Sequence, residues 1–444
     1  MARLFGTDGV RGIANQELTP ELAFKLGEAA GHFLGDKGRG RIVVGRDTRR
    51  SGDLLEAALV AGICAGGADA LLAGVIPTPA VALLVRELEA DGGVVLSASH
   101  NPPEYNGIKF FNRDGFKLPD EVEDEIETFT EADRDWERPT GAEVGTAQPI
   151  TDAVERYVDH CAATIGVDLK GLKIAVDCGH GAASVASPAA LERLGAEVVA
   201  INCEWTGMDI NVGCGSTHLG PVTELVVTSG ADFGIAHDGD ADRVLMVDET
   251  GAEVDGDAIM AICAAHMHQH GRLPLDTVVS TVMCNLGFEL AMRERGITVI
   301  KTKVGDRYVL EQLQTSGAVL GGEQSGHIIF LEHNTTGDGL VTALQVAGVV
   351  RETGLPLSEL RQVMRRFPQV LVNVHVVDKT RLGTNAAIAH AIGEVEAELG
   401  ESGRVLVRAS GTEPLVRVMA EAADHDTAAE VVDRLVSVVR AELG

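Results

Sequence analysis

The sequence predicts an α/β protein: three similar mixed-sheet α/β domains and a smaller α+β C-terminal domain around a central cleft. Short apolar runs typical of buried strands alternate with helical segments along most of the chain. The alternation restarts after a charged, Pro- and Gly-containing stretch at 133–145, and again near 255. With 444 residues, 45% of them hydrophobic, the chain can bury several separate cores.

Composition narrows the class of partner. Lys and Arg total 37 against 66 Asp and Glu, a formal net charge of −29, which disfavours nucleic acid and anionic membrane surfaces. No apolar run reaches the length of a membrane helix, and residues 1–6 lead into no apolar segment of the kind that secretion signals have, so we expect no secretion. Its seven cysteines form no Cys-x-x-Cys pair and are interpreted as reduced thiols. We therefore expect a cytoplasmic protein with a small-molecule partner, and no nucleic acid or membrane partner.

The first domain, 1–150, opens with the glycine-rich loop 6–12, which presents Arg11. Alternating strands and helices then predict βαβ units with a largely parallel sheet. The predicted strands are 41–45, 70–75, 92–96 and 108–111, and the predicted helices are 54–65, 78–89 and 120–130.

Ser97–Pro102 directly follows the apolar strand 92–96, and Asn-Pro predicts a sharp turn there. Because open α/β sheets bind ligands at the carboxyl ends of their strands, a serine in this turn is a candidate nucleophile. His100 and Lys109 are candidates for moving protons. Taken alone, an ordinary turn explains this stretch as well as a catalytic one.

The second domain, 151–254, contains three alternating carboxylates, Asp238, Asp240 and Asp242, directly after a predicted strand. Oxygen ligands separated by small residues suit Mg²⁺, and the absence of the EF-hand glycine and distal glutamate disfavours Ca²⁺. A solvated acidic turn is the alternative. The predicted strands are 172–177, 197–201 and 232–236, and the predicted helices are 152–165, 188–194 and 222–229.

The third domain, 255–366, carries the polar loop 321–327, whose side chains suit sugar hydroxyls or an amine, although a plain turn between strands would also fit. The predicted helices are 255–270, 286–295, one ending at 316, and 337–351; the predicted strands are 277–282, 298–301, 318–320 and 328–331.

The fourth domain, 367–444, carries the loop 408–414, in which hydroxyls and a glycine lie between arginines. Such a loop can hold a phosphate dianion, although a β-turn with surface arginines is the alternative. The predicted strands are 369–377 and 404–407, and the predicted helices are 386–399 and 427–443. Four complementary polar loops, one from each domain, indicate a shared cleft.

These four loops, in this order, resemble those of the α-D-phosphohexomutase superfamily over the whole chain. Its phosphoserine, metal, sugar and phosphate loops are similar to 97–102, 238–243, 322–327 and 408–414. Within the superfamily, 5–12, 303–308 and the Glu-Gln-Ser-Gly sugar loop resemble the bacterial phosphoglucosamine mutases. The phosphomannomutase/phosphoglucomutase branch usually has Met where Gln324 stands.

The resemblance implies interconversion of glucosamine 6-phosphate and glucosamine 1-phosphate, through a phosphoserine at Ser99 and a glucosamine 1,6-bisphosphate intermediate. It implies one Mg²⁺ per site, held by Ser99, Asp238, Asp240 and Asp242. Arg11, His100 and Lys109 resemble the proton-transfer and charge-stabilising residues, with the general base left open. The implied substrate-binding residues are Arg243, Glu323, Ser325, His327, Arg408, Ser410, Gly411, Thr412 and Arg417.

Three alternatives stay open from the residues. One is a phosphomannomutase/phosphoglucomutase, another is a metal-dependent sugar phosphatase, and the last is a sugar-phosphate-binding regulator without catalysis. The oligomeric state is also open, a homodimer included. The implied product would feed UDP-N-acetylglucosamine and cell-wall synthesis.

Overall fold

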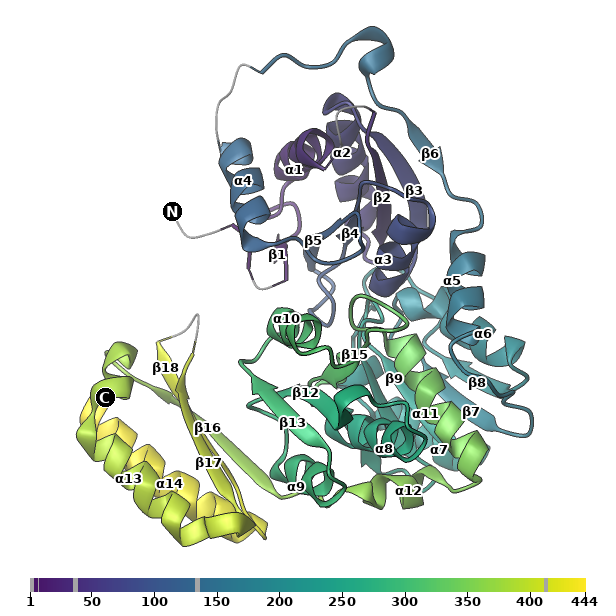
Figure 1. Ribbon diagram of the computed structural model, residues 1–444. Helices are drawn as coiled ribbons and strands as arrows, with labels where there is room; N and C mark the ends of the chain where they lie inside the picture. The colour runs from purple at the N-terminus through teal and green to yellow at the C-terminus, as the bar shows by residue number, and fades with distance from the viewer. Residues whose placement is uncertain (1–3, 7, 35–38, 132–135, 411–413) are drawn as a thin grey trace. The chain divides into compact units, whose positions relative to one another are not determined.

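The computed structural model describes residues 4–6, 8–34, 39–131, 136–410 and 414–444 (Figure 1). The chain divides into two compact units, one of residues 1–283 with 296–363 and one of residues 284–295 with 364–444. Each predicted domain segment contributes the strands of one sheet, so the predicted α/β class is confirmed, while the domain boundaries themselves stay a prediction. Among the described residues, no helix has the length and apolar character needed to cross a membrane.

The first sheet of the larger unit has the order β1-β5-β4-β2-β3-β6, in which β4, β2, β3 and β6 are parallel and β5 runs antiparallel to both of its neighbours, β1 and β4. Helices α1 and α2 cross closely because Gly27 and Gly62 leave no Cβ at the crossing; a Cβ on Gly62 would lie 2.0 Å from the Phe24 carbonyl oxygen. The elements are β1 (Val10–Ile13), α1 (Pro20–Phe33), β2 (Arg41–Arg46), α2 (Gly52–Ala65), β3 (Asp69–Val75), α3 (Thr78–Glu87), β4 (Gly92–Leu96), β5 (Tyr105–Asn112), α4 (Asp120–Glu131) and β6 (Ala147–Pro149).

The second sheet has the order β11-β10-β9-β7-β8, with β9, β7 and β8 parallel. The aspartate loop joins β9 to the antiparallel β10, so it lies at the carboxyl end of a fully buried strand. The elements are α5 (Ala153–Ala162), β7 (Lys173–Asp177), α6 (Ser187–Arg193), β8 (Glu197–Ile201), α7 (Gly220–Ser229), β9 (Phe233–His237), β10 (Val244–Asp248) and β11 (Glu253–Val254).

The third sheet has the order β13-β12-β14-β15. Strand β14 begins at Leu320 and includes Gly321 and Gly322, which the sequence placed in the sugar loop, because Gly321 pairs with both Val279 and Ile329. The elements are α8 (Gly256–Gln269), β12 (Thr277–Thr281), β13 (Thr298–Thr302), α10 (Asp306–Ser316), β14 (Leu320–Gly322), β15 (Ile328–Phe330), α11 (Gly339–Thr353) and α12 (Leu357–Leu360).

The smaller unit contains one antiparallel sheet of order β16-β18-β17, with α13 and α14 packed on it (Figure 1). Helix α9 belongs to this unit, because Asn285 at its start hydrogen-bonds both backbone groups of Phe367 and the Leu286 N–H donates to Glu421. The elements are α9 (Leu286–Glu294), β16 (Gln369–His375), α13 (Ala386–Leu399), β17 (Arg404–Ala409), β18 (Leu415–Glu421) and α14 (His425–Leu443).

Candidate active site

Ser99 lies in the turn after β4 and is almost fully buried, with 1% of its surface exposed. Its backbone adopts a left-handed conformation, φ +51°, which is uncommon for a residue with a side chain. Its hydroxyl donates to Asp238 Oδ2 at 2.6 Å and lies 3.2 Å from His100 Nδ1. The other serine of the turn, Ser97, accepts a hydrogen bond from the Ser99 N–H at 2.9 Å, and its hydroxyl donates to the buried Asp47. The structure therefore gives the two serines different environments, and only Ser99 faces the aspartate loop.

The serine turn is held by Arg49, which is fully buried beside Asp47. Arg49 Nη2 donates to the Ser99 carbonyl oxygen at 2.9 Å, and Nε donates to Asp47 Oδ2 at 2.9 Å. The same guanidinium also donates to the backbone carbonyls of Asn101, Pro102 and Tyr105. Arg49 was not among the residues selected from the sequence. The pattern that could have pointed to it is an Asp and an Arg placed directly after a buried strand.

The aspartate loop brings three buried carboxylates together, with an oxygen of each within 4.8 Å of the others. Burial, followed by the charges of Asp242 and Asp240, raises the pKa of Asp238 well above its usual value. Burial also acts on Asp240, but the ammonium of Lys109 and the hydrogen bond from Thr78 outweigh it and hold the pKa of Asp240 below its usual range. Of these two carboxylates, Asp238 is thus the one whose charged form the loop disfavours.

This donor set fits a hard divalent cation. Asp240 Oδ1 and Asp242 Oδ1 are buried and make no hydrogen bond within the described part of the chain. Buried carboxylate oxygens without partners are costly unless a cation or proton neutralises them. The Ser99 hydroxyl lies next to the same group, and oxygen-only ligands suit Mg²⁺.

Lys109 is buried on β5, and its Nζ lies 2.8 Å from Asp240, 3.1 Å from Asp8 and 3.5 Å from Asp242. Burial alone would lower the pKa of Lys109, but the charges of these three carboxylates raise it above its usual value. Lys109 is therefore a fixed positive charge beside the aspartate loop, which the Ser99 hydroxyl contacts.

A second lysine, Lys117, extends this charged network and was not among the residues selected from the sequence. Lys117 forms ion pairs with both Asp8 and Asp306, and so joins the glycine-rich loop to the start of α10. Burial disfavours the charged form of Lys117, yet Asp306 and Asp8 raise its pKa. Lys117 is 109 positions from Asp8 and 189 from Asp306 in the sequence, so no local pattern links them.

A pocket of about 470 Å³ opens beside these groups in the larger unit. Burial, together with the charges of Arg243 and Arg11, lowers the pKa of His100 to about 4. Of the predicted residues, the pocket is lined by Arg11, His100, Asp242, Arg243, Glu323 and His327. Its volume is in the usual range for small-molecule sites.

The side chains of the sugar loop have different surroundings. Glu323 lines the pocket, and its Oε1 accepts the Gly305 N–H at 3.0 Å. Gln324 instead donates to Asp255, the residue that caps α8, at 3.3 Å. Ser325 is exposed on the same loop. Gln324, the position at which the two branches of the superfamily differ, therefore makes a structural contact.

The predicted phosphate loop belongs to the smaller unit. Arg408 on β17 lies directly opposite Arg417 on β18, and burial with the charge of Arg417 lowers the pKa of Arg408. Lys379, which the sequence analysis did not select, donates to the Ser410 carbonyl oxygen at 2.7 Å. Gly411 and Thr412 lie outside the described residues. Like charges placed side by side in this way favour binding of an anion.

Four family models match the chain in succession. They are the phosphoglucomutase/phosphomannomutase alpha/beta/alpha domains I, II and III, at residues 2–136, 155–251 and 255–367, and the C-terminal domain at residues 371–438.

Individual proteins and solved structures agree with these matches. A phosphoglucosamine mutase of Desulforamulus reducens is 56% identical over 441 residues, covering 99% of each chain. The fold is similar to that of a phosphoglucomutase/phosphomannomutase family protein of Burkholderia thailandensis, with TM-score 0.82, 24% identity and coverage of 99% and 97%. It is also similar to the Aspergillus fumigatus N-acetylphosphoglucosamine mutase solved with GlcNAc-6P and magnesium, with TM-score 0.70, 19% identity and coverage of 99% and 95%.

Proposed function

The chain belongs to the phosphoglucomutase/phosphomannomutase family, and on that premise we propose that it interconverts glucosamine 6-phosphate and glucosamine 1-phosphate. The observation that carries the proposal is the buried Ser99 hydroxyl, aimed at the aspartate loop beside a pocket lined by Glu323. The 56% identity to a relative named for this activity supports the choice of sugar. The substrate is a metabolite of the cytoplasm, where we expect the protein to act.

In the proposed reaction Ser99 carries a phosphoryl group. The bond from Ser99 Oγ to phosphorus breaks as a free substrate hydroxyl bonds to the same phosphorus; the hydroxyl proton passes to a neighbouring base, and Oγ takes up a proton as it leaves. The products of this half-reaction are glucosamine 1,6-bisphosphate and the free Ser99 hydroxyl. After the sugar reorients, Ser99 Oγ gives up its proton and bonds to the phosphorus of the other phosphoryl group, the sugar oxygen–phosphorus bond breaks, and the vacated sugar oxygen regains a proton.

Arg11, His100 and Lys109 are the residues we propose for proton transfer and charge stabilisation. His100 Nδ1 lies 3.2 Å from Ser99 Oγ, close enough to exchange a proton in a suitable pose. Lys109, held charged by its carboxylate neighbours, is suited to stabilising negative charge that develops on the phosphoryl oxygens. Arg11 lines the pocket with His100.

Ser99, Asp238, Asp240 and Asp242 would hold one Mg²⁺, which when bound neutralises charge on the transferring phosphoryl group. Asp240 Oδ1 and Asp242 Oδ1, which accept no hydrogen bond from the described residues, support this ligand set. Lys109 pairs with the Asp240 and Asp242 carboxylates and offsets part of their negative charge, so the cation and Lys109 would together compensate the charge of the loop.

The residues proposed to bind the substrate form two groups. Arg243, Glu323 and His327 line the pocket and would contact the sugar, with Ser325 on the same loop. The neighbouring guanidiniums on β17 and β18 support a site for the non-reacting phosphate. That site would consist of Arg408, Ser410, Gly411, Thr412 and Arg417.

Mapping the phosphorylated residue by mass spectrometry and assaying three sugar phosphates on that same preparation tests the proposal. We expect phosphate on Ser99, isomerised glucosamine phosphate as product, and no turnover by Ser99→Ala. Ser97→Ala is the matched control, since it alters the same turn but keeps the nucleophile, so it should retain phosphorylation. Release of inorganic phosphate without isomerisation would identify a phosphatase, and preference for a mannose or glucose phosphate would assign the related hexose activity.

A further inference from the structure

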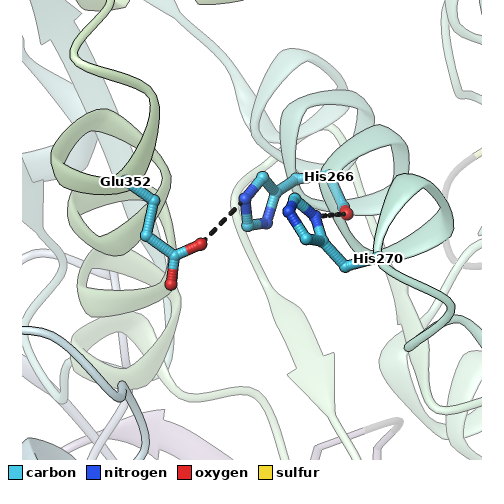
Figure 2. Close-up of side chains that lie close together, drawn as sticks. All are labelled: His266, His270 and Glu352. Atoms are coloured by element: carbon cyan, nitrogen blue, oxygen red, sulfur yellow. Dashed lines mark hydrogen bonds and ion pairs between the residues drawn. The ribbon is translucent and has the colours of Figure 1, made fainter.

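A second group of metal-ligating side chains lies outside the aspartate loop, between the ends of α8 and α11 (Figure 2). It consists of His266, His270 and Glu352. One ligand atom from each lies within 4.8 Å of the others. His266 is nearly buried, and its Nε2 lies 3.0 Å from Glu352 Oε2. None of the three has a part in the phosphoryl-transfer chemistry proposed above.

The two histidines are spaced for joint coordination. Residues four apart on a helix lie on one face, and the rings of His266 and His270 are 4.2 Å apart between centroids. His270 Nδ1 lies 2.8 Å from the His266 carbonyl oxygen, which can only accept, so Nδ1 carries the hydrogen. His270 Nε2 therefore offers a lone pair, and the backbone contact fixes the tautomer as it does for metal-bound histidines.

The ends of two helices add a favourable field for a cation. His266 and His270 lie at the C-terminal end of α8, and Glu352 lies in the last turn of α11. Helix C-termini carry partial negative charge, so both helices favour a positive ion at this place. A pocket of about 210 Å³, lined by His266, Glu352 and Cys263 among others, leaves room for a water as a further ligand.

We propose that His266, His270 and Glu352 form a Zn²⁺ site that ties α8 to α11. Two imidazoles and one carboxylate are a ligand set that zinc uses in proteins, whereas Mg²⁺ prefers oxygen ligands and would not compete here. Two of the ligand atoms, His266 Nε2 and Glu352 Oε2, are already 3.0 Å apart, and the exposed positions of His270 and Glu352 allow these side chains to close on the ion.

Arg272 is the competing cation at this site. Its Nη2 lies 3.3 Å from His266 Nδ1 and 3.9 Å from Glu352 Oε2. When His266 binds the ion through Nε2, its Nδ1 carries the hydrogen, which a guanidinium cannot accept. The guanidinium also repels the metal ion, so Arg272 has to leave these contacts when Zn²⁺ binds. Removing Arg272 should therefore tighten Zn²⁺ binding, a result that a purely structural ion pair would not produce.

The test is calorimetric titration of Zn²⁺ into the full chain in excess Mg²⁺, which keeps the aspartate loop occupied. We expect one Zn²⁺ per chain, an affinity at least about tenfold weaker in His270→Ala and in Glu352→Gln, and a tighter site in Arg272→Ala. His268→Ala is the matched control, because His268 is partly exposed on the same helix and contacts Asp276 instead; it should keep wild-type affinity.

Co²⁺ in place of Zn²⁺ gives an independent readout, with intense visible absorption bands for a low-coordinate nitrogen–oxygen site. These bands should appear in the wild type and in His268→Ala and be absent from His270→Ala. His270 is exposed, so its loss should leave the fold intact. Equal Zn²⁺ affinity of the wild type and His270→Ala, or absence of Zn²⁺ binding by the wild type, would overturn the proposal.

Discussion

Replacing Arg49 by lysine should impair catalysis without touching the substrate pocket. Arg49 donates to Asp47 and to four backbone carbonyls, those of Ser99, Asn101, Pro102 and Tyr105. An ammonium has three donors from one point, so at least two of these five acceptors lose their hydrogen bond to residue 49. At about 1.5 kcal/mol or more for each hydrogen bond from a charged group, Arg49→Lys should cost on the order of 3 kcal/mol of unfolding free energy.

The catalytic effect follows from the backbone of Ser99. Its left-handed conformation carries a strain of about 1–3 kcal/mol and persists only while neighbouring contacts enforce it. Once the Arg49 hydrogen bond is lost, the Ser99 carbonyl keeps only the neutral donor Asn211 Nδ2, at 2.9 Å, so the turn can relax and move Oγ away from Asp238. A misplacement of that size should lower kcat roughly 100-fold. KM should change little, because Arg49 does not line the pocket among the described residues.

Steady-state kinetics of a fully phosphorylated preparation, with urea unfolding of the same sample, measures both effects. Arg50→Lys is the matched control: Arg50 is the next residue and is exposed, and its backbone N–H, which the substitution keeps, donates to Gly207. If Arg49→Lys lost the expected stability but retained wild-type kcat, Arg49 would stabilise the fold without positioning the nucleophile, and the reasoning would be refuted.

Three further predictions concern the cation, the sugar and acid stability. Chelation should stop turnover and Mg²⁺ restore it, and Asp240→Asn should raise the Mg²⁺ concentration for half-maximal rate about tenfold or more, since it removes one anionic ligand; an unchanged Mg²⁺ titration would argue against the ligand set. Glucosamine phosphate should be preferred over glucose phosphate by roughly 10- to 200-fold in kcat/KM, and Glu323→Gln should narrow that ratio, whereas an equal loss on both sugars would remove Glu323 as a specificity determinant. For Asp248, burial is outweighed by hydrogen bonds from Thr250, Ala252 and Arg361, which lower its pKa. Its stabilisation should therefore be complete above the unfolded pKa near 3.9 and lost as the pH falls through the lower folded pKa; Asp248→Asn should cost about 1–3 kcal/mol in urea unfolding at pH 7 and progressively less in acid.

The sequence by itself predicted the fold class and the four polar loops. Both can be predicted from short stretches of sequence, because apolar runs indicate the strands and polar or glycine residues directly after them indicate the loops. Ser99 and the three aspartates could be selected for this reason, because each group sits within a few residues of a strand end. The predicted α/β class is confirmed, while the roles of these residues stay predictions.

The charge balance of the site was decided only by the tertiary structure. Lys109 reaches Asp240 across 131 sequence positions, and Lys117 joins Asp8 to Asp306 across 109 and 189 positions. In the sequence Arg49 resembles any charged turn residue, whereas in the structure it is buried and donates a hydrogen bond to the Ser99 carbonyl oxygen. Such contacts depend on strand register and on how separate sheets pack, which no short window of sequence contains, and they determine which charges are compensated and which are left for a ligand.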